Sequence, residues 1–159
     1  MVLKIPVTEK HHIEIGKVST HFALLESYIS NLIIIFLEKD QRIGQIITSN
    51  CSFQRLMDLL SSLAKYKLKD LNDLSDLEDL MKRANQVEQK RNSIVHSIYA
   101  AGTTSDMITR LKMIAKQDRG FKFSSQDLTA EDIHLIAEEI SKVAEDIQQF
   151  SIRISKDNL

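Results

Sequence analysis

The sequence has few of the residues that interrupt helices or cross-link a fold. Its 159 residues include one proline, four glycines and one cysteine. Proline and glycine are the strongest helix breakers, so their scarcity favours a mainly α-helical chain. The single cysteine, Cys51, excludes an intramolecular disulfide and a zinc site built from several thiolates, which is consistent with a reducing cytoplasm.

Strong net charge and long hydrophobic runs are also lacking. The formal net charge is -1, so a nucleic acid would have to bind a local basic patch rather than the field of the whole molecule. The longest apolar run, residues 32–37, is far shorter than the ~20 residues that span a bilayer, and the N-terminus does not resemble a signal peptide. We therefore expect a soluble, cytoplasmic protein with no membrane partner.

The apolar residues that are present are numerous and regularly spaced. Hydrophobic residues make up 43% of the chain, enough for the core of one domain over residues 1–159. Apolar positions recur every three or four residues, which predicts long helices near 8–38, 53–67, 75–98 and after 129, and a short helix at 41–48. We predict a mainly α, up-and-down helical bundle of four long helices and one short helix.

Capping residues and histidines mark the ends of several predicted helices. Thr8 precedes the first helix, Ser75 with Glu78 predicts a capping box for the helix at 75–98, and Thr129 precedes the last helix. The histidines of the first helix lack metal-binding spacing, so we expect surface or cap-proximal positions and no metal or cofactor; they are His11, His12 and His21.

A change of pattern before the last helix predicts a small β-hairpin. Apolar and polar residues alternate over 107–114, a turn is expected at 117–120, and a partner strand at 121–123. The cations of this hairpin, interleaved with Phe121 and Phe123, suit single-stranded RNA; a solvated edge protected from aggregation by lysines is the other interpretation. These cations are Arg110, Lys112, Lys116, Arg119 and Lys122.

Arg91 is the residue on the helix at 75–98 that most needs a partner. It falls on the apolar stripe of that helix, and a guanidinium that is partly buried requires a carboxylate, a phosphate or water. Glu26 on the flank of the first helix, or Glu88, could supply that carboxylate, and a solvated Glu26 is an equally good interpretation. Asn92 and His96 lie beside the stripe, on a polar seam with Asn85 and Gln89.

The arrangement of Arg91, Asn92 and His96 resembles the signature of the HEPN superfamily: an arginine, a polar residue, three more residues and a histidine, at the end of a long helix. Members of that superfamily are small helical bundles that dimerise, bring two such motifs together and, in their active branches, cut RNA without a metal. The resemblance implies a toxin- or defence-type endoribonuclease with a protein antitoxin or regulator as a partner. It assigns proton transfer to His96, phosphate binding to Arg91 and an orienting role to Asn92, with Gln89 as a supporting residue. DNA is not expected as a substrate because it lacks the attacking 2'-hydroxyl.

A second interpretation of the same residues involves no catalysis. The chain would be a non-catalytic helical dimer, an interaction or regulatory module, in which Arg91 is a buried structural ion paired with Glu26 or Glu88. His96 would then simply end a helix, and the net acidity of the chain favours this interpretation. Under both interpretations we expect a symmetric homodimer with the motif helices near the two-fold axis, because the polar seam lacks the apolar residues needed to face a core of its own.

Overall fold

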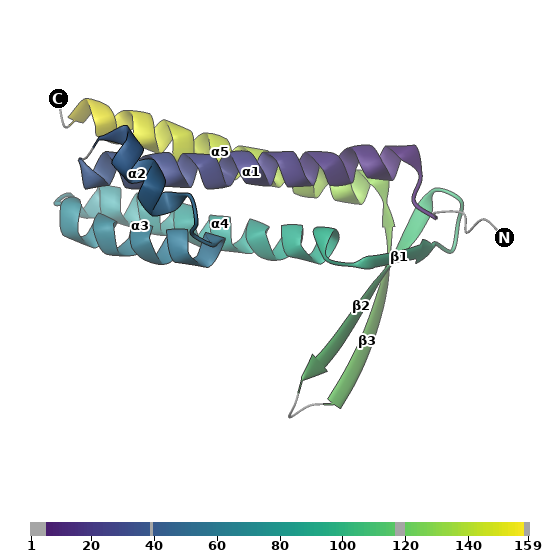
Figure 1. Ribbon diagram of the computed structural model, residues 1–159. Helices are drawn as coiled ribbons and strands as arrows, with labels where there is room; N and C mark the ends of the chain where they lie inside the picture. The colour runs from purple at the N-terminus through teal and green to yellow at the C-terminus, as the bar shows by residue number, and fades with distance from the viewer. Residues whose placement is uncertain (1–5, 39, 117–119, 158–159) are drawn as a thin grey trace. The chain divides into compact units, whose positions relative to one another are not determined.

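The structure is a computed structural model that describes residues 6–38, 40–116 and 120–157, with side chains described for 6–38, 40–112 and 123–156. Within these ranges the helices are α1 (Glu9–Leu37), α2 (Gln41–Thr48), α3 (Phe53–Lys67), α4 (Leu71–Val95) and α5 (Ala130–Asp157) (Figure 1). The strands β1 (Ile98–Ala101), β2 (Met107–Lys116) and β3 (Gly120–Thr129) form an antiparallel sheet. The predicted mainly α fold, with a small β element before the last helix, is confirmed.

The chain divides into two compact units, which we describe separately. The first unit combines the chain up to Thr20 with Glu88–Glu139, and the second combines His21–Val87 with the chain from Ile140. Helices α1, α4 and α5 each contribute residues to both units. The single domain expected over residues 1–159 stays a prediction.

The second unit is a helical bundle with an apolar core. Its buried residues recur at three- and four-residue steps, as the amphipathic pattern predicts. Phe22 and Phe53 pack with their ring centroids 5.2 Å apart, joining α1 to α3. Buried apolar side chains of this core include Leu25, Ile29, Leu32, Ile33, Leu56, Leu60, Leu77, Ala84, Ile140, Val143, Ile147 and Phe150.

The first unit contains the sheet, whose strand order is β1-β2-β3. Ile108 of β2 pairs with Leu128 of β3, and both side chains are buried. Asp127 of β3 accepts hydroxyl hydrogen bonds from Thr103 (2.6 Å) and Thr109 (2.5 Å), and the Thr103 bond is the main reason its pKa is lowered. Strand β1 pairs only with residues 108–111 of β2. Beyond that point β2 and β3 continue as a two-stranded ribbon, which we call the arm (residues 112–116 and 120–124).

The limits of α4 differ from the prediction at both ends. The helix begins at Leu71, not Ser75, because Asp70 accepts a hydrogen bond from the Asn72 amide (2.7 Å) and caps an earlier start. It ends at Val95, and Ile98, expected on the buried stripe, lies in β1 with its side chain 57% exposed. The predicted hairpin strands are present as the antiparallel pair β2 and β3, and β1, which the alternation did not predict, extends them to a three-stranded sheet.

Other predicted helix ends are confirmed. Helices α2 and α3 have the predicted limits, and the Ser52 hydroxyl caps α3 by accepting a hydrogen bond from the Arg55 amide (3.3 Å). At the start of α5, Asp132 accepts a hydrogen bond from the Thr129 amide (2.8 Å), while the Thr129 hydroxyl accepts one from the Asp132 amide (3.1 Å). These reciprocal bonds form a capping box, which fixes where β3 becomes α5.

His11 is cap-proximal, as predicted for one of two alternatives, but its side chain is only 1% exposed, so the surface alternative is wrong for it. Its Nδ1 lies 2.7 Å from the Thr8 hydroxyl and its Nε2 lies 3.3 Å from the Leu128 carbonyl oxygen. The ring therefore connects the start of α1 to the end of β3, which excludes it from solvent. His12 is exposed and His21 is half-buried.

Helix α1 is long and apolar enough to cross a membrane by length and composition alone. A core helix of a soluble protein passes the same test. The buried side chains of α1, among them Val18, Leu25, Ile29 and Leu32, lie against other parts of this chain.

Replacement of two helical glycines by alanine should change the stability of the protein in opposite directions. A Cβ at Gly44 of α2 would lie 2.5 Å from Cγ1 and 3.1 Å from Cβ of Ile34, whereas a Cβ at Gly16 of α1 would meet nothing within 4 Å. Overpacking costs ~1–3 kcal/mol and exceeds the ~1 kcal/mol gain in helix propensity. We predict that Gly44→Ala lowers the unfolding free energy by ~1–2 kcal/mol and that Gly16→Ala raises it by ~0.5–1 kcal/mol. Urea denaturation of the two variants measures both; a stabilised Gly44→Ala would contradict the close approach of α2 to α1.

Candidate functional site

The three motif residues contact one another at the C-terminal end of α4. Nη1 of Arg91 donates a hydrogen bond to Oδ1 of Asn92 (2.8 Å) and lies 3.4 Å from Nε2 of His96. Arg91 and Asn92 are half-buried, whereas His96 is exposed just beyond the last helical residue. One helix end thus presents a guanidinium, an amide and an imidazole in a single cluster.

The contact between Arg91 and His96 favours one tautomer of the histidine ring. A guanidinium donates hydrogen bonds and accepts none, so Nε2 of His96 is the accepting nitrogen if the contact is a hydrogen bond. In a neutral ring that contact favours the proton on Nδ1. A neutral imidazole with a lone pair on Nε2 is the form that can take up a proton in catalysis.

The end of α4 is capped by side chains from the sheet. The last intrahelical bond runs from the His96 amide to the Asn92 carbonyl (3.2 Å). The next two carbonyls would lack helical partners. That of Ser93 accepts from the Ser97 hydroxyl (2.7 Å) and from Nη1 of Arg110 (3.4 Å). That of Ile94 accepts from the Tyr99 hydroxyl (2.7 Å). These caps stop the helix directly beside His96.

Tyr99 is suited to a capping role at all ordinary pH values. Burial raises the pKa of its hydroxyl, and the nearby charge of Arg110 only partly offsets this effect. The hydroxyl therefore stays protonated and keeps donating to the Ile94 carbonyl. The cation of Arg110 also suits this position, because a helix C-terminus carries a partial negative charge.

The two carboxylates that could pair with Arg91, those of Glu88 and Glu26, belong to different compact units. Glu88 accepts a hydrogen bond from Nδ2 of Asn92, so Asn92 bridges Glu88 and Arg91 within one helix. Glu26 belongs to the other compact unit, and its pairing with Arg91 stays a prediction. Gln89 is exposed, and the side-chain hydrogen bonds described here do not connect it to the motif.

The cations predicted to contact RNA are only partly within the described side chains. Arg110 is half-buried at the base of the arm, where Nη2 donates to Oε1 of Gln126 (2.8 Å), and Lys112 is exposed. Lys112 pairs in register with Ser124, so strand alternation puts Phe123 on the opposite face of the arm. Charge from Lys112 and stacking on Phe123 would therefore act on different faces of the arm, and binding of RNA stays a prediction. Lys116 and Lys122 lie in β2 and β3 but outside the described side chains, and Arg119 lies outside the described residues.

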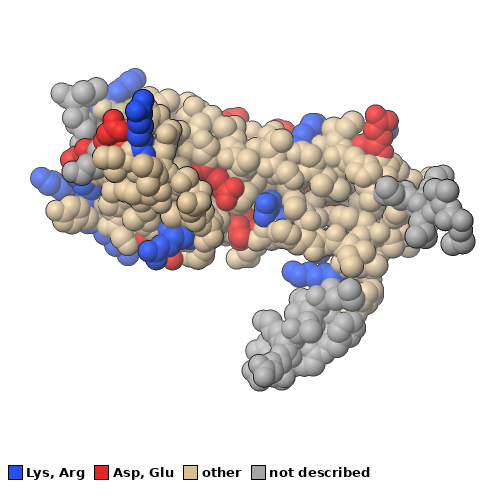
Figure 2. All heavy atoms as spheres, in the orientation of Figure 1, with Lys and Arg blue, Asp and Glu red and all other residues tan. Residues whose placement is uncertain are grey.

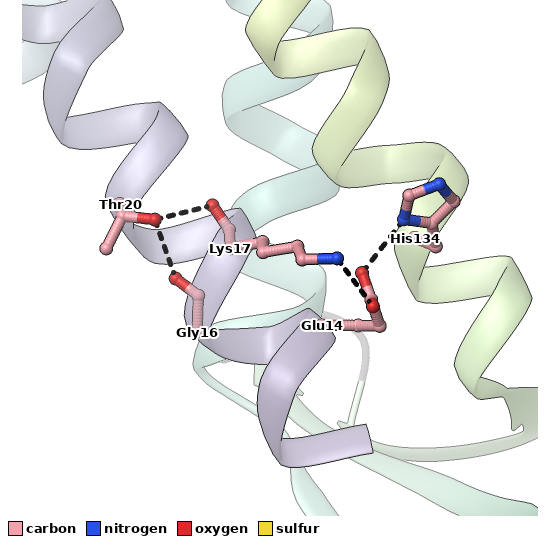
Figure 3. Close-up of polar contacts among 5 residues, drawn as sticks. All are labelled: Glu14, Gly16, Lys17, Thr20 and His134. Atoms are coloured by element: carbon pink, nitrogen blue, oxygen red, sulfur yellow. Dashed lines mark hydrogen bonds and ion pairs between the residues drawn. The ribbon is translucent and has the colours of Figure 1, made fainter. Parts of the chain in front are cut away.

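Sequence reasoning missed an ion-paired histidine in the same unit. Glu14 of α1 lies between Lys17, one turn further along the helix, and His134 of α5 (Figure 3). Its carboxylate is 2.9 Å from Nζ of Lys17 and 3.0 Å from Nδ1 of His134. His134 is therefore half-buried in a contact between residues 120 positions apart, for which a single sequence has no signal.

Among the described residues, no group of three or more His, Cys, Asp or Glu side chains is placed to hold a metal ion. Comparison of the chain with protein-family models, with curated proteins and with solved structures gave no match. The geometry of the site itself is therefore the basis for the functional argument.

The Glu14 cluster predicts a pH-dependent contribution to stability. The hydrogen bond from Lys17, followed by that from His134, lowers the pKa of Glu14 below its ordinary value of 4.5. A depressed carboxylate pKa adds stability above the unfolded-state pKa, and this stability is lost as pH falls through the folded-state pKa. We predict that Glu14→Gln lowers the unfolding free energy by ~0.2–1 kcal/mol at pH 6 and has progressively less effect below pH ~4.5. Urea denaturation of the parent and of Glu14→Gln between pH 4 and pH 6 tests this prediction, with Glu78→Gln, a change at an exposed carboxylate, as the control. If the stability difference between parent and Glu14→Gln does not change with pH, the ion pairing of Glu14 is contradicted.

Proposed function

We propose that this protein is a HEPN-like, metal-independent endoribonuclease of the toxin or defence type that acts as a homodimer. The supporting observation is the contact cluster of Arg91, Asn92 and His96, with the histidine exposed to an incoming substrate. These residues supply three of the functions that RNA cleavage by internal transfer uses: a base, a phosphate ligand and an orienting group.

His96 acts as the general base. It takes the proton from a ribose 2'-hydroxyl, whose oxygen then attacks the adjacent phosphorus. The P–O bond to the 5'-oxygen of the next nucleotide breaks, leaving a 2',3'-cyclic phosphate on one product and a 5'-hydroxyl on the other. Because the nucleophile belongs to the substrate, the reaction needs neither a metal-bound water nor a covalent enzyme intermediate.

Arg91 moves between two partners in this cycle. Its 3.4 Å contact with His96 is longer than a good N–H···N hydrogen bond and therefore inexpensive to give up. When a phosphate enters, the guanidinium transfers to the phosphate oxygens, binds them bidentately and stabilises the charge of the transition state. This exchange frees the lone pair on Nε2 of His96 for the 2'-hydroxyl. Asn92, which accepts from Arg91, limits how far the guanidinium can swing.

A homodimer supplies the missing acid. Each copy of the motif offers one histidine, while cleavage needs one group to remove a proton and another to deliver a proton to the leaving 5'-oxygen. A two-fold axis near the ends of the α4 helices brings a second His96 to the same phosphate, and this ring acts as the acid by entering the cycle with both of its nitrogens protonated. Exposure of His96, rather than burial in its own chain, is compatible with this arrangement.

One observation favours a second candidate, a non-catalytic interaction or regulatory module. Asn92 is bonded on both sides, to Arg91 and to Glu88, within a single helix. A closed network of this kind stabilises a helix end without any ligand. Under this alternative, substitutions in the cluster change stability or assembly and have no effect on RNA.

Cleavage of RNA is the direct test of the proposed activity. We predict that the purified protein cuts single-stranded RNA in the presence of EDTA, leaves DNA of the same sequence intact and produces 2',3'-cyclic phosphate ends. Replacing His96 with alanine should reduce the rate at least ~100-fold, the usual contribution of general acid–base catalysis. Its exposed side chain leaves no core cavity, so the melting temperature should change little.

The matched control is His12→Ala, which removes an exposed histidine outside the cluster and should retain full activity. Cleavage that EDTA abolishes, or that survives His96→Ala, would refute the mechanism. If the parent protein leaves the RNA uncut, the non-catalytic interaction module is the favoured function.

Assembly provides a separate prediction. Sedimentation equilibrium at micromolar concentration should give twice the chain mass, and Arg91→Ala and His96→Ala should both remain dimeric, because the residues act on substrate. If the parent protein is strictly monomeric, no second histidine is present at the site and the mechanism that uses two histidines is contradicted.

A further inference from the structure

Helix α2 turns its most apolar side chains away from the core of its own unit. Its buried residues are Gly44 and Thr48, whereas its isoleucines are exposed. Ile46 lies about 200° around the helix from Gly44 and is 74% exposed. Ile43 and Ile47 are 49% and 42% exposed. We call these three isoleucines, which have the i, i+3, i+4 spacing of one helix face, the α2 ridge.

The packing of α2 against α1 prevents the ridge from turning inward. A Cβ at Gly44 would lie 2.5 Å from Cγ1 of Ile34, so only a glycine fits where the two helices meet. Rolling α2 to bury an isoleucine would place a much larger side chain at this contact. Amphipathic helices normally bury their apolar face, because burial of one isoleucine contributes ~1.5–3 kcal/mol. The α2 ridge therefore indicates a contact with a surface outside this chain.

The size of the α2 ridge suits a weak contact. Its three side chains expose about 300 Å², which is within the ~300–600 Å² of the largest apolar patch on a typical monomer. A stable protein–protein interface takes about 800 Å² from each partner. Even with the polar residues around it, the ridge lies at the lower end of this scale. Association through it should therefore depend strongly on protein concentration.

The rim of the α2 ridge is polar but mainly uncharged. Between residues 40 and 50 the only charged residues are Asp40 and Arg42, which have opposite signs. Figure 2 shows mainly uncharged surface along α2, in the orientation of Figure 1. An apolar centre that is poor in charge, with a polar rim, is the composition of a protein–protein interface. The exposed uncharged residues of this rim are Gln41, Gln45, Ser49 and Asn50.

This rim favours a second copy of the same chain as the partner. A two-fold contact places a surface against its own copy, so a rim with charge of one sign would repel itself. A glutamine amide both donates and accepts hydrogen bonds and can therefore pair with its own copy. A membrane surface fits less well, because α2 has eight residues and one cation, whereas helices that lie on membranes are rich in lysine and arginine.

We propose that the α2 ridge binds the α2 ridge of a second copy, with the two helices antiparallel about a two-fold axis beside Ile46. Ile43 of one copy then faces Ile47 of the other. This contact belongs to the helical-bundle unit and is separate from the contact between α4 ends that the proposed nuclease requires. A chain that makes both two-fold contacts joins dimers into larger assemblies. The proposal does not rest on the nuclease function.

Sedimentation equilibrium of the full chain from about 5 to about 500 µM tests the proposal, since interfaces of this size are weak. The mass of the parent should rise with concentration, whether from the dimer proposed above or from a monomer. Ile46→Glu should weaken this association at least ~10-fold, because it places a charge against its own copy in an apolar contact. Leu71→Glu is the control: it makes the same change at a side chain of α4 that is 79% exposed, and its mass should rise as in the parent.

Cross-linking locates the contact. Cys51→Ser removes the only native thiol, so a cysteine introduced in this background is the only one to react. Ile46→Cys should give covalent dimers with a short bis-maleimide, because the two-fold axis brings the two thiols together. Leu71→Cys in the same background should remain largely monomeric on a denaturing gel. Circular dichroism verifies that each variant is folded.

Three results would overturn the proposal: a mass that does not rise with concentration, equal effects of Ile46→Glu and Leu71→Glu, or equal cross-linking at the two positions. If the mass is constant and phosphatidylcholine vesicles bind the parent but not Ile46→Glu, the ridge contacts a membrane instead. The outcome is separable from that for the proposed function. A parent that is dimeric at every concentration would retain the nuclease assembly and refute this contact, whereas a rise from monomer to dimer that Ile46→Glu removes would do the reverse.

Discussion

The hydrogen bond from the Tyr99 hydroxyl to the Ile94 carbonyl (2.7 Å) caps the end of α4, with a longer contact from Arg110 to the Ser93 carbonyl (3.4 Å) beside it. A helix end leaves carbonyls unsatisfied, and many helices end with a glycine or are followed by a proline. Neither residue occurs here until Gly102. The sheet supplies the caps instead, so the end of the helix and the start of β1 depend on the same two side chains.

Several features of the site follow from that constraint. Ending the helix at Val95 leaves His96 in the turn, close enough to the helix for Arg91 to reach its ring and exposed enough to meet a ligand. The same cap fixes the base of the arm, because Arg110 belongs to β2 and contacts the helix end. The cluster of Arg91, Asn92 and His96 and the base of the arm are thus adjacent through hydrogen bonds at the end of α4.

The helices were predictable because their signals are local. Apolar periodicity identified α1, α2, α3 and α5, and short-range capping chemistry at Ser52 and Thr129 set their ends. The end of α4 was not predictable, since Ile94 and Ile98 both continue the helical spacing while the caps come from up to 17 residues further along. Contacts between distant residues, such as Glu14 with His134 and His11 with Leu128, were missed for the same reason. The three motif residues were found because their spacing is local; their mutual contacts required the structure.

The tautomer of His96 tests the central claim most directly, namely that the capped end of α4 holds Arg91 against the imidazole and prepares it as a base. Nitrogen-15 NMR of the ring, recorded at a pH where it is neutral, distinguishes protonated Nδ1 from protonated Nε2. The donor character of Arg91 predicts the proton on Nδ1 and an accepting Nε2. Free histidine prefers the opposite tautomer, so a ring found mainly with its proton on Nε2 would contradict the Arg91–His96 contact and the catalytic role built on it.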